Sequence, residues 1–240
     1  MEHQLKIIAE HIPADTFIKL LSDFKSMNET LHLCLQPTDF LRQDKSHVYG
    51  MHGVGHITRT LFWAHILNFL QKHDKAVSNA TLIASMIHDL GRLADHNDPD
   101  HGFRSQEMCK LYVQKHLLDK NLLTECLAAV EHHSKLDVAN ASSQKPEIWQ
   151  TLKDADALER ERLHSHNVNS DMLRSSRLTS DKKLRDALII LARELVEITA
   201  NTRWHKEPCK DFVNALADSV QAKHFPLSDE TIQNIYRLKE

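Results

Sequence analysis

Histidine and aspartate residues recur in short clusters along the first two thirds of the chain. The clusters are His52 with His56, His88-Asp89, His101, His132-His133, and Asp154 with Asp156. Imidazole and carboxylate are the ligands that divalent zinc, manganese, iron and cobalt accept together. Each cluster lies far enough from the next to belong to a separate helix. The sequence therefore predicts a helical cage around metal.

The elements that must carry these residues are predicted to be helices. Only five glycines and six prolines occur in the 240 residues, and apolar residues recur mostly at helical spacing. Helices are expected over residues 2–11, 14–25, 28–35, 55–73, 78–90, 103–119, 122–134, 146–160, 181–203, 209–223 and 228–239. The polar run Asn140 to Lys145 is expected to be a loop, and Ser180 the N-cap of the helix after it. Since no linker or repeat interrupts the pattern, we expect an all-α chain with one domain over residues 1–240.

Helical spacing also indicates which polar side chains face a core. His56 and His133 fall on apolar stripes of their helices, and His88 follows an apolar run. Asp156 lies near the apolar face of its helix, whereas Asp154 is rotated from that face by about 160° at about 100° per residue. We therefore predict Asp156 as a ligand and Asp154 as a supporting or solvent-facing carboxylate.

The glycines single out the same region of the chain. All five lie between residues 50 and 102: Gly50, Gly53, Gly55, Gly91 and Gly102. Glycine is favoured where the backbone turns sharply or approaches another group closely. Gly91, which follows His88-Asp89, is expected to end a helix.

Charge and cysteine content narrow the choice of partner and compartment. A formal net charge of -3 gives no reason to expect an obligate nucleic-acid partner or an acidic membrane. The four cysteines are widely spaced without a Cys-x-x-Cys pair, which argues against a zinc knuckle, a redox motif or a disulfide framework. No apolar signal segment opens the chain, and the most apolar stretch contains His65 and Asn68. We expect a cytoplasmic protein with a small substrate and no membrane span.

The order His, then His-Asp, then a distant Asp resembles the HD-domain metal-dependent phosphohydrolase superfamily. The matching stretches are His52–Arg59, Ile87–Arg92 and Leu152–Leu158, within residues 50–160 or so. The longer string through His101–Ser105 and Asp154–Arg160 is similar to a group of small bacterial HD proteins. The resemblance implies an all-α HD-domain helical bundle with extra N- and C-terminal helices in residues 1–49 and 161–240.

The resemblance also implies a ligand set. The basic metal set of the superfamily corresponds to His56, His88, Asp89 and Asp156. His101 and the pair His132-His133 resemble the extra ligands of its two-metal branches, which include cyclic-dinucleotide phosphodiesterases and a diiron oxygenase that cleaves inositol. Two features depart from the pattern: Arg92 stands where a lysine is often found, and His101 follows His88 closely. We expect one or two divalent ions (Mn, Fe, Co, Ni, Zn or Mg), with one favoured over two.

The chemistry expected of such a site is hydrolysis of a phosphate ester. A divalent ion lowers the pKa of its water from near 16 to about 7, which supplies hydroxide at neutral pH. Guanidinium groups bind phosphoryl oxygens in bidentate fashion, and Arg92 is favoured for this over Arg59 and Arg104. Asp89, Arg92 and His52 are the predicted catalytic residues, with His52 as an acid or base or a supporting group.

Two alternative functions remain open at this stage. Many histidines with few carboxylates also suit iron that binds dioxygen, as in a diiron oxygenase of the inositol-oxygenase type. A non-catalytic HD scaffold that senses a nucleotide is the other alternative. The leading prediction is a phosphohydrolase or phosphodiesterase acting on a nucleotide or a related small phosphorylated metabolite.

Overall fold

The computed structural model describes residues 2–27, 50–93, 95–135, 146–163, 168, 170–204, 207–222 and 229–239. Within these ranges every regular element is a helix, which confirms the all-α prediction. The chain divides into two compact units, one formed by Met1–His32 with Ala157–Glu240 and the other by Leu33–Asp156. The boundary between the units falls inside helix α8 (Glu147–Glu159), so the single domain over residues 1–240 stays a prediction.

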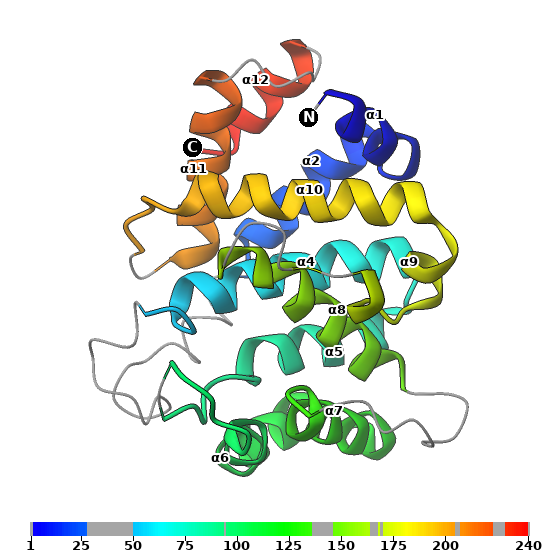
Figure 1. Ribbon diagram of the computed structural model, residues 1–240, viewed down its shortest axis with the longest axis vertical. Helices are drawn as coiled ribbons and strands as arrows, with labels where there is room; N and C mark the ends of the chain where they lie inside the picture. Colours follow the sequence, from blue (N-terminus) through cyan, green and yellow to red (C-terminus); the bar gives the residue numbers. More distant parts are fainter. Residues whose placement is uncertain are drawn as a thin grey trace. The chain divides into compact units, whose positions relative to one another are not determined.

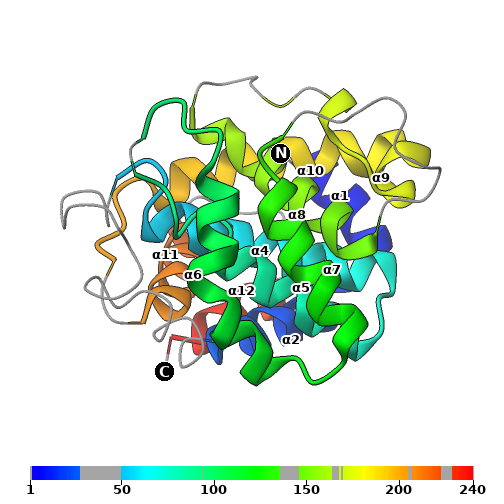
Figure 2. The ribbon, with the colours of Figure 1, turned by 90° about the horizontal axis from the view of Figure 1, so that it is seen from below.

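The unit Leu33–Asp156 contains α4 (Val54–Gln71), α5 (Lys75–Ile87), α6 (His101–His116), α7 (Lys120–His132) and most of α8. Helix α5 packs against α4, α6 and α7. Helices α6 and α7 run side by side (Figure 2). Helix α4 is buried along almost its whole length, which matches its long run of apolar residues.

Capping residues fix where two of these helices begin. The Asp74 side chain accepts hydrogen bonds from the backbone N–H groups of Ala76 and Val77 at 2.8 Å each. Asp119 accepts in the same way from Asn121 at 2.8 Å and Leu122 at 3.0 Å. A helix whose first turn is satisfied in this way has a fixed start. Ligand candidates follow directly after the ends of α5 and α7, so a fixed start for each helix helps to fix where these candidates lie.

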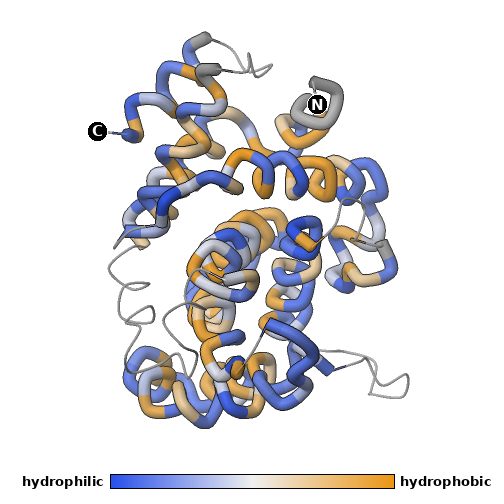
Figure 3. The backbone as a smooth tube through the Cα atoms, turned by 60° about the vertical axis from the view of Figure 1, so that its left-hand side comes forward, coloured by the Kyte–Doolittle hydropathy of each residue, from blue (hydrophilic) through white to orange (hydrophobic). Residues whose placement is uncertain are grey.

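The unit with both termini contains the remaining helices. These are α1 (Glu2–His11), α2 (Ala14–Lys25), the 3₁₀ turns η2 (Arg160–Arg162) and η3 (Ser170–Met172), α9 (Ser176–Ser180), α10 (Lys182–Thr199), α11 (Pro208–Ala222) and α12 (Asp229–Arg237). Helix α10, yellow in Figure 1, packs against α1, α9 and α11. Figure 3 shows apolar and polar residues alternating turn by turn along the helices of the chain, as expected of amphipathic helices.

Several details differ from the sequence prediction. Ser180 is the last residue of α9, and the N-cap of α10 is Asp181, whose side chain accepts from the Leu184 N–H at 3.0 Å. The short helix α9 was not predicted, because five residues are too few to show a periodicity. The predicted helix over residues 28–35 and the predicted loop from Asn140 to Lys145 lie outside the described residues. Among the described helices, none combines the length and apolar character needed to cross a membrane.

Candidate metal centre

Five helices of the unit Leu33–Asp156 deliver the ligand candidates to one place. His56 lies in the first turn of α4, and Asp156 lies near the end of α8. The other candidates lie at helix ends: His88 and Asp89 follow α5, His101 begins α6, and His133 follows α7. The clusters that are separate in sequence are therefore brought together by the helix ends.

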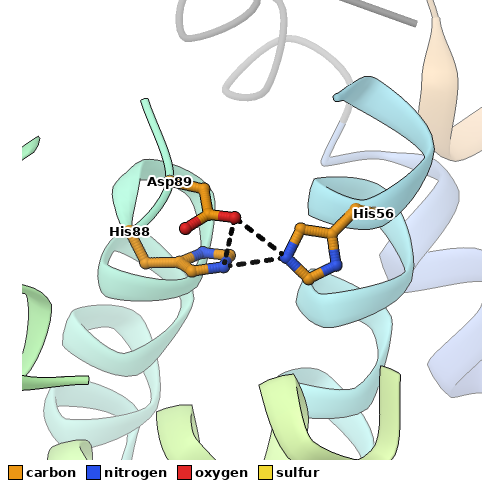
Figure 4. A group of neighbouring side chains, drawn as sticks. All are labelled: His56, His88 and Asp89. Carbon is orange, nitrogen blue, oxygen red and sulfur yellow. Dashed lines mark hydrogen bonds and ion pairs between the residues drawn. The ribbon is translucent and has the colours of Figure 1, made fainter. Parts of the chain in front are cut away.

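The first ligand group consists of His56, His88, Asp89 Oδ2 and Asp156. His56 Nε2 lies 3.1 Å from His88 Nε2 and 3.3 Å from Asp89 Oδ2 (Figure 4). Asp156 Oδ1 is 3.5 Å from His56 Nε2 and 3.9 Å from His88 Nε2. The imidazoles and Asp89 are buried, whereas the Asp156 side chain is 27% exposed. This group is the set that the sequence predicted for a basic metal site.

The second ligand group consists of His101, His133 and the other oxygen of Asp89. His101 Nε2 lies 2.9 Å from His133 Nε2 and 3.0 Å from Asp89 Oδ1, and His133 Nε2 lies 3.4 Å from the same oxygen. The ligand atoms of this group lie within 4.8 Å of one another, as do those of His56, His88 and Asp89. Asp89 therefore bridges the two groups, with one oxygen facing each.

Hydrogen bonds to the backbone determine which ring nitrogen of three histidines is protonated. His88 Nδ1 donates to the Ser85 carbonyl at 2.8 Å, His133 Nδ1 donates to the Val130 carbonyl at 2.7 Å, and His101 Nδ1 donates to the Asp98 carbonyl. Since a carbonyl oxygen only accepts, Nδ1 carries the proton in each case.

The Nε2 atom of each ring therefore faces the centre, where it can offer a lone pair to a metal ion. His56 Nδ1 lies 3.4 Å from the Thr60 hydroxyl.

The charges of the side chains in the cluster favour the binding of a cation. Burial lowers the pKa of His88 to about 3, so this ring is neutral. Burial alone would raise the pKa of Asp89, but His88, His101 and His133 outweigh that effect and hold the Asp89 pKa well below its usual value. Imidazole nitrogens and carboxylate oxygens thus face one another at about 3 Å, an arrangement that a cation between them would stabilise.

Asp89 Oδ1 is buried and makes no hydrogen bond of good geometry among the described residues, although His101 Nε2 and His133 Nε2 lie 3.0 Å and 3.4 Å away. An orphaned buried carboxylate oxygen is costly in a protein interior. Burial raises the pKa of Asp156 on its own, yet the nearby His56 and His88 lower this pKa to about 2, so Asp156 is also an ionised acceptor. The donor set, imidazole nitrogen with carboxylate oxygen, fits divalent transition ions.

Two glycines allow the second ligand group to form. A Cβ at Gly91 would lie 2.3 Å from the Ser105 backbone nitrogen, and a Cβ at Gly102 would lie 2.6 Å from the Val130 carbonyl oxygen. These two approaches bring the start of α6 against both the segment after Asp89 and the end of α7. Gly91 lies in a turn after α5, as expected, but none of the described glycines has a positive φ. Close approach, and not a left-handed conformation, explains why glycine is needed there.

The predicted catalytic residues flank the two groups. Arg92 Nε lies 3.3 Å from Asp89 Oδ2, and its Nη2 lies 3.4 Å from His101 Nε2. The ring centroid of His52 is 5.7 Å from that of His56, and His52 Nδ1 donates to Asp95 Oδ1 at 3.0 Å. Asp95 was not predicted, since a partner 43 residues away leaves no local signal. A mostly buried histidine such as His52 commonly has a carboxylate partner, but the sequence does not indicate that this partner is Asp95.

Other predicted residues lie elsewhere. The His132 side chain is 48% exposed with Nε2 3.8 Å from Glu131 Oε1, and the structure brings it into neither ligand group. Of the adjacent pair, His133 is buried within the second ligand group, whereas His132 is half exposed. We therefore drop His132 from the ligand set. The solvent-facing interpretation of Asp154 is wrong, because this residue is fully buried. Arg104 is ion-paired with Asp98 instead of pointing at the ligands.

Comparisons of this chain with protein-family models, with curated proteins and with solved structures found no match.

Proposed function

We propose that this protein is a metal-dependent phosphohydrolase of the HD-domain type. Its substrate would be a phosphate ester of a nucleotide or of another small phosphorylated metabolite. The observation that carries the proposal is Asp89, a buried carboxylate that bridges two groups of imidazoles whose Nε2 lone pairs converge on it.

The two ligand groups support two ions in place of the single ion favoured by the sequence. One ion would be held by His56, His88 and Asp156, the other by His101 and His133, and both by Asp89. A pair of divalent ions, when bound, supplies an activated water and neutralises charge on both sides of a displacement at phosphorus.

The charge balance favours an anionic substrate. Two divalent ions would carry more positive charge than Asp89 and Asp156 can offset, and Arg92 adds a further cation beside Asp89. A phosphoryl group compensates this excess, and its oxygens accept hydrogen bonds from guanidinium N–H groups. A neutral diol, the substrate class of the oxygenase alternative, leaves the excess uncompensated.

His52 is the proposed acid or base. Its Nδ1–H is donated to Asp95, which leaves Nε2 as the atom that exchanges a proton with the substrate or leaving group. Asp95 also accepts from the backbone N–H groups of Met51 and His52. Burial raises the pKa of Asp95, but these hydrogen bonds outweigh that effect and lower the pKa, so the carboxylate stays charged and would stabilise a protonated His52.

The diiron oxygenase remains the second candidate, because four imidazoles with two carboxylates also suit iron. A nucleotide-sensing scaffold without turnover is a third. Metal identity and substrate class separate the three.

The test begins with elemental analysis of protein purified without added metal or chelator. Chelator-stripped protein is then loaded with Mn, Fe, Co, Ni, Zn or Mg. It is assayed for phosphate release from mononucleotides and sugar phosphates, and for ring opening of cyclic dinucleotides to the linear product. We expect hydrolysis that chelator and Asp89→Ala abolish, and that Asp100→Ala, an exposed aspartate near the site, leaves unchanged.

Oxygen consumption by the iron-loaded protein with a non-phosphorylated diol would instead support the oxygenase. A nucleotide-induced thermal shift without turnover would support the scaffold.

A further inference from the structure

The loop from Arg92 to Asp100 joins the two ligand groups, because it follows Asp89 and ends at His101. Its described residues have few buried apolar side chains, so packing does not hold the course of the loop itself. The hydrogen bonds of Arg104 and Asp98 provide the missing constraint.

Arg104, in the first turn of α6, ties both ends of this loop together. Its Nε donates to the Gly91 carbonyl at 2.8 Å, which fixes the segment just after Asp89. Its Nη2 donates to both carboxylate oxygens of Asp98 near the other end of the loop. A second hydrogen bond joins Gly91 to α6, because the Gly91 N–H donates to the Ser105 hydroxyl at 2.7 Å.

Asp98 connects this network directly to a ligand. Its carboxylate also accepts from the Leu93 N–H at 3.0 Å, and its backbone carbonyl accepts the Nδ1–H of His101. Both side chains of the ion pair are mostly buried, at 17% exposed for Arg104 and 12% for Asp98. A mostly buried pair is screened by water less than a surface pair, so its geometry is held more firmly.

We propose that Arg104 and Asp98 are positioning residues for the second ligand group. Their ion pair holds the Asp98 backbone carbonyl that accepts from His101 Nδ1, and so keeps His101 Nε2 in place for a metal ion. Neither residue belongs to a ligand group. The inference rests on the proposed function only in requiring that the cluster bind divalent metal. Groups that orient metal ligands typically contribute 10–100-fold to metal affinity.

A purely structural ion pair would behave differently from a positioning pair. Loss of a structural pair lowers the midpoint of thermal unfolding and leaves the number of ions bound unchanged. Loss of a positioning pair selectively weakens one of two ions. Metal stoichiometry therefore separates the two roles without any assay of activity.

The experiment is a titration of chelator-stripped full-length protein with Co²⁺, followed by its visible absorption and by elemental analysis after desalting. Wild type is expected to bind two ions. Arg104→Ala is expected to bind one ion with unchanged affinity and the other about 10–100-fold more weakly, in the same manner as His133→Ala. Lys110→Ala, which removes an exposed cation from the same helix, is the matched control and should titrate like wild type.

Arg104→Lys and Asp98→Asn are the companion variants for the case in which Arg104→Ala does not fold. Lysine reaches only one of the two acceptors, and asparagine keeps the backbone carbonyl but loses the ion pair, so both should weaken the same single ion. Two ions with wild-type affinity in these folded variants, or equal weakening of both ions, would overturn the inference. A wild type that binds no Co²⁺ would contradict the metal centre itself, and the inference with it.

Discussion

The two ligand groups share Asp89 but are built in different ways. In the first ligand group, His56 and Asp156 project from within helices, and Asp156 is partly exposed. In the second ligand group, both imidazoles lie at helix ends, are buried and are oriented by backbone carbonyls. The first group is therefore the more solvent-accessible of the two. The second is a closed position whose geometry depends on a loop and on the contact between α6 and α7.

The largest effect is expected from Asp89→Ala, the change that tests whether the groups are coupled at all. Each ion would lose one of its ligands. If about four ligands share a binding free energy of about 10–16 kcal/mol, the loss of one weakens binding by about 3 kcal/mol. That loss is a weakening of about a hundredfold or more for both ions. Co²⁺ titration against the Asp100→Ala control measures it. Retention of one ion at wild-type affinity would show that Asp89 serves only one group.

The next largest effect contrasts two adjacent histidines. His133→Ala should weaken one ion by about a hundredfold and leave the other unchanged, because only the second ligand group loses a nitrogen. His132→Ala should change neither by more than about twofold, since an exposed side chain outside the centre contributes within about 0.5 kcal/mol. If His132→Ala reduced the metal content and His133→Ala did not, the assignment of the pair would be reversed.

Helical spacing in the sequence could predict residues of both ligand groups. The helical period places His56 on a buried face of α4 and Asp156 toward the ligands, and both placements follow from side-chain direction alone. The same period places His133, and not His132, on the apolar stripe of its helix, so the choice between these two also follows from side-chain direction.

What the sequence could not supply is long-range contact. The approach of Gly102 to Val130, the pairing of His52 with Asp95 and the fixing of the loop by Arg104 join residues that are separated along the chain. Five glycines near the ligands did signal close approach, but not which segments meet. The fold class and the residues of both ligand groups were therefore predictable, whereas the contacts that bring the second group together needed the structure.

A smaller effect is expected from Gly102→Ala, which tests the contact between α6 and α7. The added Cβ would lie 2.6 Å from the Val130 carbonyl oxygen, which also accepts from His133. Overpacking costs about 1–3 kcal/mol, and the better helix propensity of alanine offsets about 1 kcal/mol of that. The midpoint of thermal unfolding should fall by a few degrees, since 1 kcal/mol corresponds to about 2–4 °C at this length. Circular dichroism measures this midpoint, and an unchanged value would show that α7 moves aside without cost.

The same variant should weaken the ion at the second ligand group and leave the first group unaffected. The reason is that α7 can yield to the new methyl group only by displacing the carbonyl that orients His133. Equal weakening of both ions would mean that the groups are not independent.

The smallest effect is expected from Thr60→Val, which tests how tightly the first ligand group is oriented. The substitution keeps the shape of the side chain but removes the hydroxyl that lies 3.4 Å from His56 Nδ1. A hydrogen bond at this long distance contributes near the lower end of about 0.5–1.5 kcal/mol, so metal affinity should fall by about two- to threefold. Thr60→Ser keeps the hydroxyl and should bind Co²⁺ as wild type does. A loss of tenfold or more in Thr60→Val would mean that the Thr60 hydroxyl orients His56 as firmly as the backbone carbonyls orient His101 and His133.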